Sequence, residues 1–521
     1  MDTMTQSLGF SYHGTNALVF LGIAVAVVGA VISTARQWFR LSHVPGPFIA
    51  SITSLWAYRS ISRLRFHQTA EDLQKRYGKI VRITPTDVLI SDPDNLWRIN
   101  SARSSYTRGN WYGSIRFNPY GDSVFSELDT AKHDKRKAKL TFGFSGKGLL
   151  DIEGSVDQHI AVLVDVLKNR INEGNGQAIV DMGLLLQYFQ VDLITLAGMG
   201  KAWGNLSSNK DHFQYLTTAD KLFQFVHATS MVPTFRTVLF SPLFLRLFGA
   251  STTTGWLGEI KKAVEQRVKG EKEQDVGGDM LEEWLKHDLS PTEAELDLSV
   301  QVPAGTETSI TTIRGILMYL ITSPSIYYKL KKEISDGIEH GHISRPIKNE
   351  EARNLPYLQA VLSEGMRMSP PLTAGFPKTV PPGGDVICGK ILPAGTEVHT
   401  NYIALMKDEE VFGRDAEMFR PERFIDCDEA TKARRKKVVD LNFGHGRWLC
   451  LGRVLALMEL NKIFVECGTL MVVQLLRSFD FQVVNPENPW LRESTLSFYI
   501  KDFFVQVKTD SISGRYSENW T

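Results

Sequence analysis

The 521-residue sequence predicts a mainly α-helical protein with a minor β component, preceded by one transmembrane helix. Helical patterns of apolar residues dominate from about Gln158 to Gln301, and further long helical patterns follow. Strand-like alternation occurs only in short stretches. An uncharged apolar run near the N-terminus predicts the membrane helix.

The N-terminal segment contains no Asp, Glu, Lys or Arg between Asp2 and Arg36. About 20 apolar residues in a helix span the hydrocarbon core of a bilayer. Basic and aromatic residues follow this run and no basic region precedes it, which is typical of a cytoplasmic flank. We therefore expect a lumenal tail over 1–15 and an anchor over 16–35. A cleaved signal peptide and a buried core helix are the alternatives.

The rest of the chain predicts one large domain over 48–510, between a proline-containing hinge over 36–47 and a tail over 511–521. Residues 77–91 alternate and are rich in β-branched side chains, which indicates a hairpin of short strands.

Two long helices and further short strands are expected in the second half. One helix begins near Pro291 and runs into the 320s, and another covers about Tyr357 to Met368 and ends before a proline pair. Strands are expected between Thr379 and Val398, followed by a loop-rich region and then a helix from Cys450 to about Leu476.

Composition excludes some classes of function. The chain has 59 basic and 58 acidic residues, so its net charge of +1 gives no reason to expect a nucleic-acid partner. Its four cysteines show no paired spacing, which argues against a disulfide framework and favours reduced, cytosol-facing surroundings.

The most specific segment is FGHGRWLCLG, residues 443–452. Its cysteine, Cys450, stands just before an uninterrupted run of helix formers. Free backbone N–H groups and the helix dipole stabilise a thiolate at such a helix N-terminus. Glycines on both sides would let the backbone approach a flat macrocycle. A lone cysteine is more often inert packing, and only the surrounding pattern argues otherwise.

This segment resembles the cysteine loop of the cytochrome P-450 family. Phe443, Gly446, Cys450 and Gly452 fall at that family's phenylalanine, glycine, ligand cysteine and following glycine. The resemblance implies the cytochrome P-450 fold, a haem b group, and Cys450 as the axial ligand of its iron.

It also implies that Phe443, Gly444 and Gly452 contact the haem. The family commonly has arginine two residues before the cysteine, where this chain has Trp448. Arg447 beside it is then a candidate partner for a haem propionate. An arginine followed by an aromatic resembles filamentous-fungal members.

A second segment, Glu364-Gly-Met-Arg367, places a carboxylate and a guanidinium at i and i+3 of one helix. Alone, this spacing is usually an ordinary surface pair. Followed by two prolines, it resembles the family's Glu-x-x-Arg helix, whose third member would be Arg423. Guanidinium groups bind carboxylates bidentately, so we expect a buried scaffold with a structural role.

A third segment, Ala304-Gly-Thr-Glu-Thr308, lies inside the long helix. Glycine is a poor residue for a helix interior, and a threonine hydroxyl bonds back one turn. The segment resembles the family's oxygen-binding groove, which makes Glu307 and Thr308 the expected acid and alcohol, with Ala304 against the haem. An amphipathic helix with a solvated glutamate is the alternative.

Further haem and substrate contacts follow only from the resemblance. His133, Lys137 and Lys378 are candidate propionate partners, the alternative for the first two being a solvated basic helix end. The expected substrate-pocket residues, besides Ala304, are aromatic: Trp111, Phe117, Phe376 and Phe498. This set implies an apolar substrate.

The resemblance implies a monooxygenase that activates O2 with electrons from NADPH. NADPH-cytochrome P-450 reductase is the expected donor, with cytochrome b5 as a second one, at the endoplasmic reticulum membrane. Hydroxylation, epoxidation or desaturation of a fungal terpenoid, alkaloid or polyketide would result. A haem-thiolate isomerase or dehydratase, and a haem sensor or electron carrier, are the alternatives.

Six residues between Thr431 and Val438, Lys-Ala-Arg-Arg-Lys-Lys, form a basic run. Such a run is often a solvated loop. The alternative is a surface near the cysteine that steers an acidic electron donor.

Overall fold

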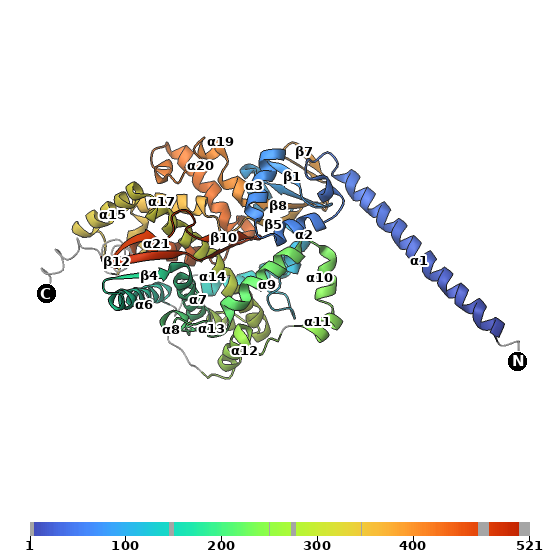
Figure 1. Ribbon diagram of the computed structural model, residues 1–521, viewed down its shortest axis with the longest axis horizontal. Coiled ribbons are helices and arrows are strands. Elements are labelled where there is room, and N and C mark those ends of the chain that lie inside the picture. Colours follow the sequence, from blue (N-terminus) through green and yellow to red (C-terminus); the bar gives the residue numbers. More distant parts are fainter. Residues whose placement is uncertain are drawn as a thin grey trace.

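A computed structural model describes residues 5–144, 151–249, 251–271, 278–344, 346–466 and 479–509. Many helices surround a few small sheets, and one long helix projects away from the body (Figure 1). The prediction of a mainly helical protein with a minor β component is confirmed.

The helices range in length from about one turn to about ten turns. The α-helices are α1 Thr5–Arg40, α2 Leu55–Ser62, α3 Phe66–Tyr77, α4 Pro93–Asn100, α5 Thr130–Phe144, α6 Ile152–Glu173, α7 Met182–Met199, α8 Asn205–Ser208, α9 Tyr215–Ser230, α10 Pro233–Leu239, α11 Pro242–Phe248, α12 Gly255–Val268, α13 Met280–Lys286, α14 Pro291–Ile321, α15 Pro324–Glu339, α16 Asn349–Arg353, α17 Pro356–Met368, α18 Tyr402–Met406, α19 Glu409–Phe412, α20 Glu429–Asp440 and α21 Arg453–Glu466. Short 3-10 helices are η1 Phe48–Ser51, η2 Asn110–Ser114, η3 Pro421–Phe424, η4 Leu441–Phe443 and η5 Gly446–Trp448.

The strands form four small sheets. They are β1 Ile80–Arg82, β2 Asp87–Ile90, β3 Thr107–Arg108, β4 Gln177–Asp181, β5 Ala374–Thr379, β6 Asp385–Ile387, β7 Lys390–Leu392, β8 Glu397–Asn401, β9 Phe479–Val483, β10 Leu491–Ser494, β11 Phe498–Lys501 and β12 Phe504–Thr509. The largest sheet has the order β1-β2-β8-β5-β3. Its β1–β2 hairpin, with Ile80 opposite Ile90, confirms the strands predicted over 77–91.

Helix α14 begins and runs as its sequence predicts. Ser290 caps it in a reciprocal pair with Glu293, and Pro291 occupies the first turn, where its missing N–H has no intrahelical partner to lose. The helix is buried along most of its length and packs against α7. Helix α17 likewise matches the predicted 357–368 segment.

Helix α1 is longer at both ends than the predicted 16–35 anchor, because no proline interrupts it before Pro45. Its last turn is tied to the body by the buried Arg82. The guanidinium of Arg82 donates to the carbonyls of Gln37 and Trp38 at 2.9 and 3.1 Å. The first five residues of the predicted hinge are therefore helical.

One helix of the described chain, α7, is long and apolar enough to cross a membrane, and 89% of it is buried in the body. It is therefore a core helix. The apolar side chains of α1 behave differently: Phe20 is 71% exposed and Val31 is 61% exposed.

The basic run lies on helix α20 and not in a loop, because Asp428 caps its N-terminus and Ala, Arg and Lys are good helix formers. Beyond Glu466, the helix predicted to Leu476 lies outside the described residues, as do the 1–4 end of the N-terminal tail and the 511–521 tail.

Candidate active site

A cavity of about 310 Å³ lies between α14 and the loop that carries Cys450. Its walls are mainly apolar. The residues that line it include Tyr112, Phe125, Phe144, Ile194, Val300, Ala304, Gly305, Thr308, Phe376, Phe443, Gly444, Trp448, Cys450 and Gly452. Three regions singled out in the sequence, at 304–308, Phe376 and 443–452, therefore meet around one space.

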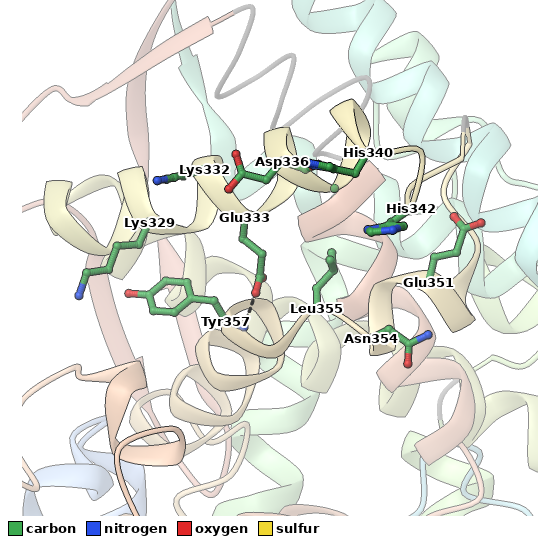
Figure 2. A pocket seen from close by; sticks show the side chains of 11 residues that line it. Lys329, Lys332, Glu333, Asp336, His340, His342, Glu351, Asn354, Leu355 and Tyr357 are labelled. Atoms are coloured by element: carbon green, nitrogen blue, oxygen red, sulfur yellow. Dashed lines mark hydrogen bonds between the residues drawn. The ribbon is translucent and has the colours of Figure 1, made fainter.

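A larger groove of about 750 Å³ lies at the surface between α15 and the α16–α17 region, and charged side chains line it (Figure 2). One of these, Glu333, accepts hydrogen bonds from the backbone N–H groups of Tyr357 and Leu358 at 2.7 and 2.8 Å. Glu333 therefore caps the N-terminus of α17, which is a structural role.

Cys450 stands at the N-terminus of α21 and faces the cavity. Its backbone N–H donates to the carbonyl of Phe443 at 2.7 Å, which closes the loop. Gly444 has φ +70°, and a Cβ there would lie 2.8 Å from the carbonyl oxygen of Trp448, so this turn requires glycine.

Burial raises the pKa of the Cys450 thiol, whereas backbone N–H groups of Gly452 and Arg453 and the charge of Lys137 act in the opposite direction. These donors would stabilise a thiolate. Coordination to a metal ion removes the thiol proton outright.

One end of the cavity is cationic. The Nζ of Lys137 donates to the carbonyls of Arg447 and Leu449 at 2.8 and 2.6 Å, and the buried Lys378 Nζ donates to the hydroxyl of Tyr112 at 2.9 Å. Arg108 lies behind them, 5.2 Å from the Trp448 ring, and its Nε has no hydrogen-bond partner.

None of Arg108, Lys137 and Lys378 forms an ion pair with a carboxylate of the described chain. Burial, and next the charge of Arg108, lower the pKa of Lys137 to about 8 and that of Lys378 well below its ordinary value. Lys378 is buried, Lys137 and Arg108 are partly buried, and all three donate only to neutral oxygens of the described chain, so their charges favour an anionic ligand. Together with Cys450 and the apolar walls, they fit a haem with its propionates at this end.

His133 and Trp448 share this end of the cavity, with ring centroids 5.1 Å apart. Burial, and next Arg108, lower the pKa of His133 to about 4, so the imidazole is neutral at pH 7. Arg447 points elsewhere: its Nε lies 3.2 Å from Asp134 Oδ2, and it is absent from the described lining. The aromatic Trp448 occupies the wall instead.

The α14 wall carries Thr308, whose hydroxyl donates to the carbonyl of Ala304 at 2.7 Å. Pro303 lacks the N–H that would bond to the carbonyl of Ser299, so α14 lacks one backbone hydrogen bond just before Ala304. Thr308 and Ala304 thus lie on the cavity wall, where the sequence placed them.

Glu307 lies on a different side of α14. Its Oε1 accepts hydrogen bonds from Gln187 Nε2 of α7 at 2.9 Å and from the Tyr215 hydroxyl of α9 at 3.1 Å, and it is not part of the described lining. Burial, and next the charge of Asp220, raise its pKa to about 7. The structure therefore brings Thr308 to the cavity and leaves the Glu307 carboxylate behind the helix.

A buried acid that the sequence analysis missed, Glu459 of α21, does line the cavity. Gln190 Nε2 donates to its Oε2 at 3.1 Å, and its Oε1 has no partner. Burial raises its pKa to about 7, against hydrogen bonds from Gln190 and Ser309. The one available signal was a glutamate within an apolar helical run. Arg108, also missed, gave no signal at all.

The predicted scaffold is assembled away from the cavity. Arg367 Nε and Nη2 each lie 2.7 Å from one oxygen of Glu364, and Arg423 Nε lies 3.4 Å from Glu364 Oε1. All three side chains are fully buried. Arg367 also donates to the carbonyls of Met406 and Ala416, so it joins α17 to the chain that leads to Cys450.

Only some of the predicted substrate-pocket residues line the cavity. Phe376 lines the cavity, and the Trp111 ring packs behind it at 5.7 Å. Phe117 packs against Phe223 at 4.9 Å, and Phe498 lies against His67 and under the Arg492 guanidinium. The latter two are outside the described lining because other aromatic and cationic groups cover them.

A helical body with a cavity-facing cysteine at a helix N-terminus and cations nearby suits a haem whose iron is held by a thiolate. A family model described as Cytochrome P450 matches residues 44–507. The chain belongs to the cytochrome P450 family, and its enzyme class is cytochrome P450 monooxygenase.

Similar proteins come from filamentous fungi. Cytochrome P450 monooxygenase aba1 of Botryotinia fuckeliana is 36% identical over 86% of this chain and 88% of its own length. Cytochrome P450 monooxygenase abl1 of Leptosphaeria maculans is 36% identical over 92% of this chain and 83% of its own length. Cytochrome P450 monooxygenase ABA1 of Pyricularia oryzae is 35% identical over 93% of this chain and 96% of its own length. The predicted likeness to fungal members is confirmed.

Proposed function

We propose that the chain is a haem-thiolate monooxygenase that oxidises an apolar secondary metabolite with electrons from NADPH, delivered by a reductase. The observation that carries this proposal is Cys450 facing the same apolar cavity as Thr308 of α14. When bound, the haem supplies the activation of O2 and the transfer of one oxygen atom.

The chain's own groups have separate tasks. Cys450 would ligate the iron, and Lys137, Lys378 and Arg108 would hold the propionates. Thr308 carries an exchangeable proton at Oγ1 on the cavity wall. Glu307, with its pKa raised to about 7 by burial, can bind and release protons near neutral pH, and it would exchange them with the cavity through a side-chain rotation or water.

The substrate class follows from the cavity wall. Its lining beside Thr308 is apolar and aromatic, with Ile194, Val300 and Phe376. Such walls bury hydrocarbon and discriminate weakly among polar substituents. We therefore propose a terpenoid, alkaloid or polyketide-derived metabolite, in accord with the fungal relatives.

The function is tested with a panel of such metabolites, the full chain in detergent and purified reductase. We expect a panel member to be consumed only when NADPH, reductase and O2 are all present, with label from ¹⁸O2 in a hydroxylated or epoxidised product. Consumption without NADPH or O2 would identify an isomerase or dehydratase instead. Failure of every apolar metabolite to perturb the haem spectrum would favour a sensor or electron carrier.

The Thr308→Val variant is expected to lower kcat about 100-fold with little change in KM, because general acid catalysis contributes at least that factor. Valine keeps the shape of the side chain and removes the proton carrier. Thr311→Val is the matched control, since that hydroxyl donates to the carbonyl of Glu307 at 2.8 Å within α14 and does not line the cavity. Equal kcat values for the two variants would contradict the role of Thr308.

The location and donor are also proposed. The exposed apolar side chains of α1 support a single-pass anchor in the endoplasmic reticulum membrane, with the body in the cytosol.

On α20, Arg434 and Lys436 are exposed, whereas Arg435 donates to the carbonyls of Val411 and Arg423. We propose that the exposed pair steers the acidic reductase. Slower haem reduction in Arg434→Glu/Lys436→Glu at low salt, lost at high salt, is the test.

A further inference from the structure

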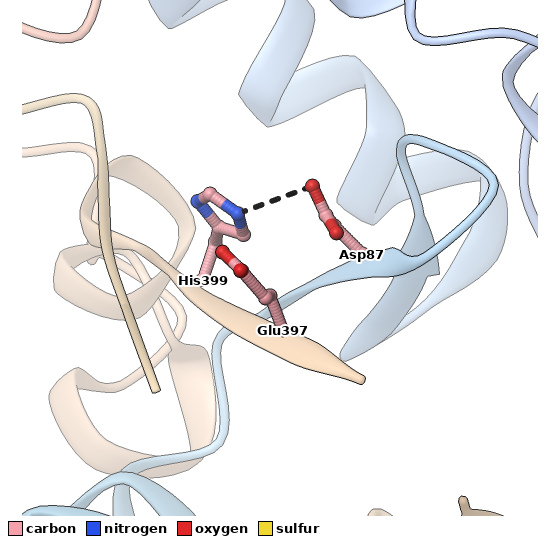
Figure 3. Close-up of side chains that lie close together, drawn as sticks. All are labelled: Asp87, Glu397 and His399. Atoms are coloured by element: carbon pink, nitrogen blue, oxygen red, sulfur yellow. Dashed lines mark ion pairs between the residues drawn. The ribbon is translucent and has the colours of Figure 1, made fainter. Parts of the chain in front are cut away.

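The largest sheet carries a cluster of three ligand-type side chains away from the cysteine cavity. Strands β2 and β8 run parallel, with Asp87 opposite Glu397. His399 follows Glu397 by two residues, so it projects from the same face of the sheet. Figure 3 shows the three side chains converging, with the two β8 residues beside Asp87.

The cluster is buried, and its two carboxylates are compensated by His399 and by the backbone N–H groups of Asn110 and Trp111. Glu397 is 8% exposed and His399 2%, and only Asp87 is partly open to solvent. Within the described chain, no lysine or arginine forms an ion pair with either carboxylate, and His399 is the one basic group beside them. Burying two carboxylates without a cation is costly.

The His399 ring and the Asp87 carboxylate face each other at ion-pair distance, drawn as the dashed line in Figure 3, without a hydrogen bond between them. Thr86 Oγ1 donates to Asp87 Oδ1 at 2.7 Å, which orients the carboxylate. The other oxygen, Oδ2, lies 3.6 Å from His399 Nε2, which is too far for a hydrogen bond. His399 Nε2 is buried and has no hydrogen-bond partner.

We propose that Asp87, Glu397 and His399 bind a zinc ion. One ligand atom from each residue lies within 4.8 Å of the other two. Zinc takes nitrogen and oxygen ligands at about 2.0–2.2 Å in a tetrahedron, so ligand atoms stand about 3.4 Å apart. Small side-chain movements close the difference, and water on the open side of Asp87 completes the tetrahedron.

The site connects to the cysteine cavity through Glu397. Its Oε1 accepts a hydrogen bond from the backbone N–H of Asn110 at 2.6 Å, at the start of η2. Tyr112 of η2 lines the cavity and holds Lys378. A zinc ion that fixes Glu397 therefore stabilises the segment that forms the cationic end.

The test uses the full chain with its haem, in detergent, treated with EDTA and dialysed against buffered Zn²⁺. Bound zinc is counted by mass spectrometry, with haem iron counted separately. We expect a single zinc ion per chain, and binding weaker by at least about 100-fold in Asp87→Asn and His399→Gln, since even outer contacts of a metal site cost up to that factor. Zinc should also slow hydrogen exchange in Asn110–Ser114 of the unmodified chain alone.

The control is His340→Ala/His342→Ala, which removes two histidines from the surface groove of Figure 2 and should leave zinc binding unchanged. Haem content and the thermal midpoint show that each variant is folded. Equal zinc binding by the unmodified chain and His399→Gln would overturn the proposal. Absence of bound zinc, or its loss only in the surface control, would overturn it too.

Discussion

Replacement of Cys450 by alanine is expected to abolish the thiolate signature of the carbon monoxide complex and all NADPH-dependent turnover. Cys450 is the one cysteine among those described that faces the cavity, so no neighbouring sulfur can substitute for it. The measurement is the difference spectrum of the reduced, carbon monoxide-bound protein.

The matched control for this prediction is Cys427→Ala, since Cys427 is partly buried and is not among the residues that line the cavity. That variant should give the unmodified spectrum and activity. A thiolate-type spectrum that survives Cys450→Ala would remove the ligand assignment. If Cys427→Ala alone abolished the thiolate-type spectrum, the iron ligand would be Cys427 instead of Cys450.

The Arg367→Ala variant is expected to be the most destabilising change in the scaffold, by about 3–5 kcal/mol, because it leaves the buried Glu364 carboxylate without its bidentate partner. Arg423 remains, but its Nε is 3.4 Å away and its Nη1 already bonds Asp415. The carbonyls of Met406 and Ala416 also lose their donor. Thermal unfolding and haem content after purification are the measurements.

Lys329→Ala is the comparison. It breaks an ion pair with Glu422 at 2.5 Å in which Lys329 is 57% exposed, and exposed pairs contribute about 0–1 kcal/mol. Its midpoint should stay close to that of the unmodified protein. A similar midpoint for Arg367→Ala would show that the buried cluster does not hold the body together.

Much of the fold was predictable because it follows local patterns. Helix α14 could be foreseen from Pro291 and its apolar periodicity, and the β1–β2 hairpin from β-branched alternation. The basic run was harder, since its sequence is nearly all charged and has no apolar face. Only the Asp428 cap marked it as a helix.

The site was predictable where a resemblance covered several residues in a row. Cys450 and Thr308 meet at one cavity as expected. Glu307 shows the limit: α14 presents the pairs 300–301, 304–305 and 308–309 to the cavity, and residue 307, about 100° before Thr308 around the helix, falls outside that face. Its partners, Gln187 and Tyr215, come from distant helices that no local pattern identifies.

The cationic end of the cavity was predictable only in part. Lys137 and Lys378 could be placed by their positions near characteristic segments, whereas Arg108 sits in a two-residue strand without a distinctive neighbourhood. Its importance arises from tertiary packing against Tyr112 and Trp448. Contacts between residues far apart in the sequence, such as Arg108 and Trp448, cannot be predicted from the spacing of residues along the chain.

The hydrogen bonds from Arg82 to the last turn of α1 fix the direction of the N-terminal helix relative to the body. Its 36 residues measure about 54 Å, whereas the predicted anchor over 16–35 measures about 30 Å, close to the thickness of the hydrocarbon core of a bilayer. With that segment in a bilayer, the last five residues of the same helix would hold the body about 8 Å beyond the hydrocarbon. The direction of α1 would therefore set the orientation of the whole body relative to the lipid surface from which apolar compounds reach it.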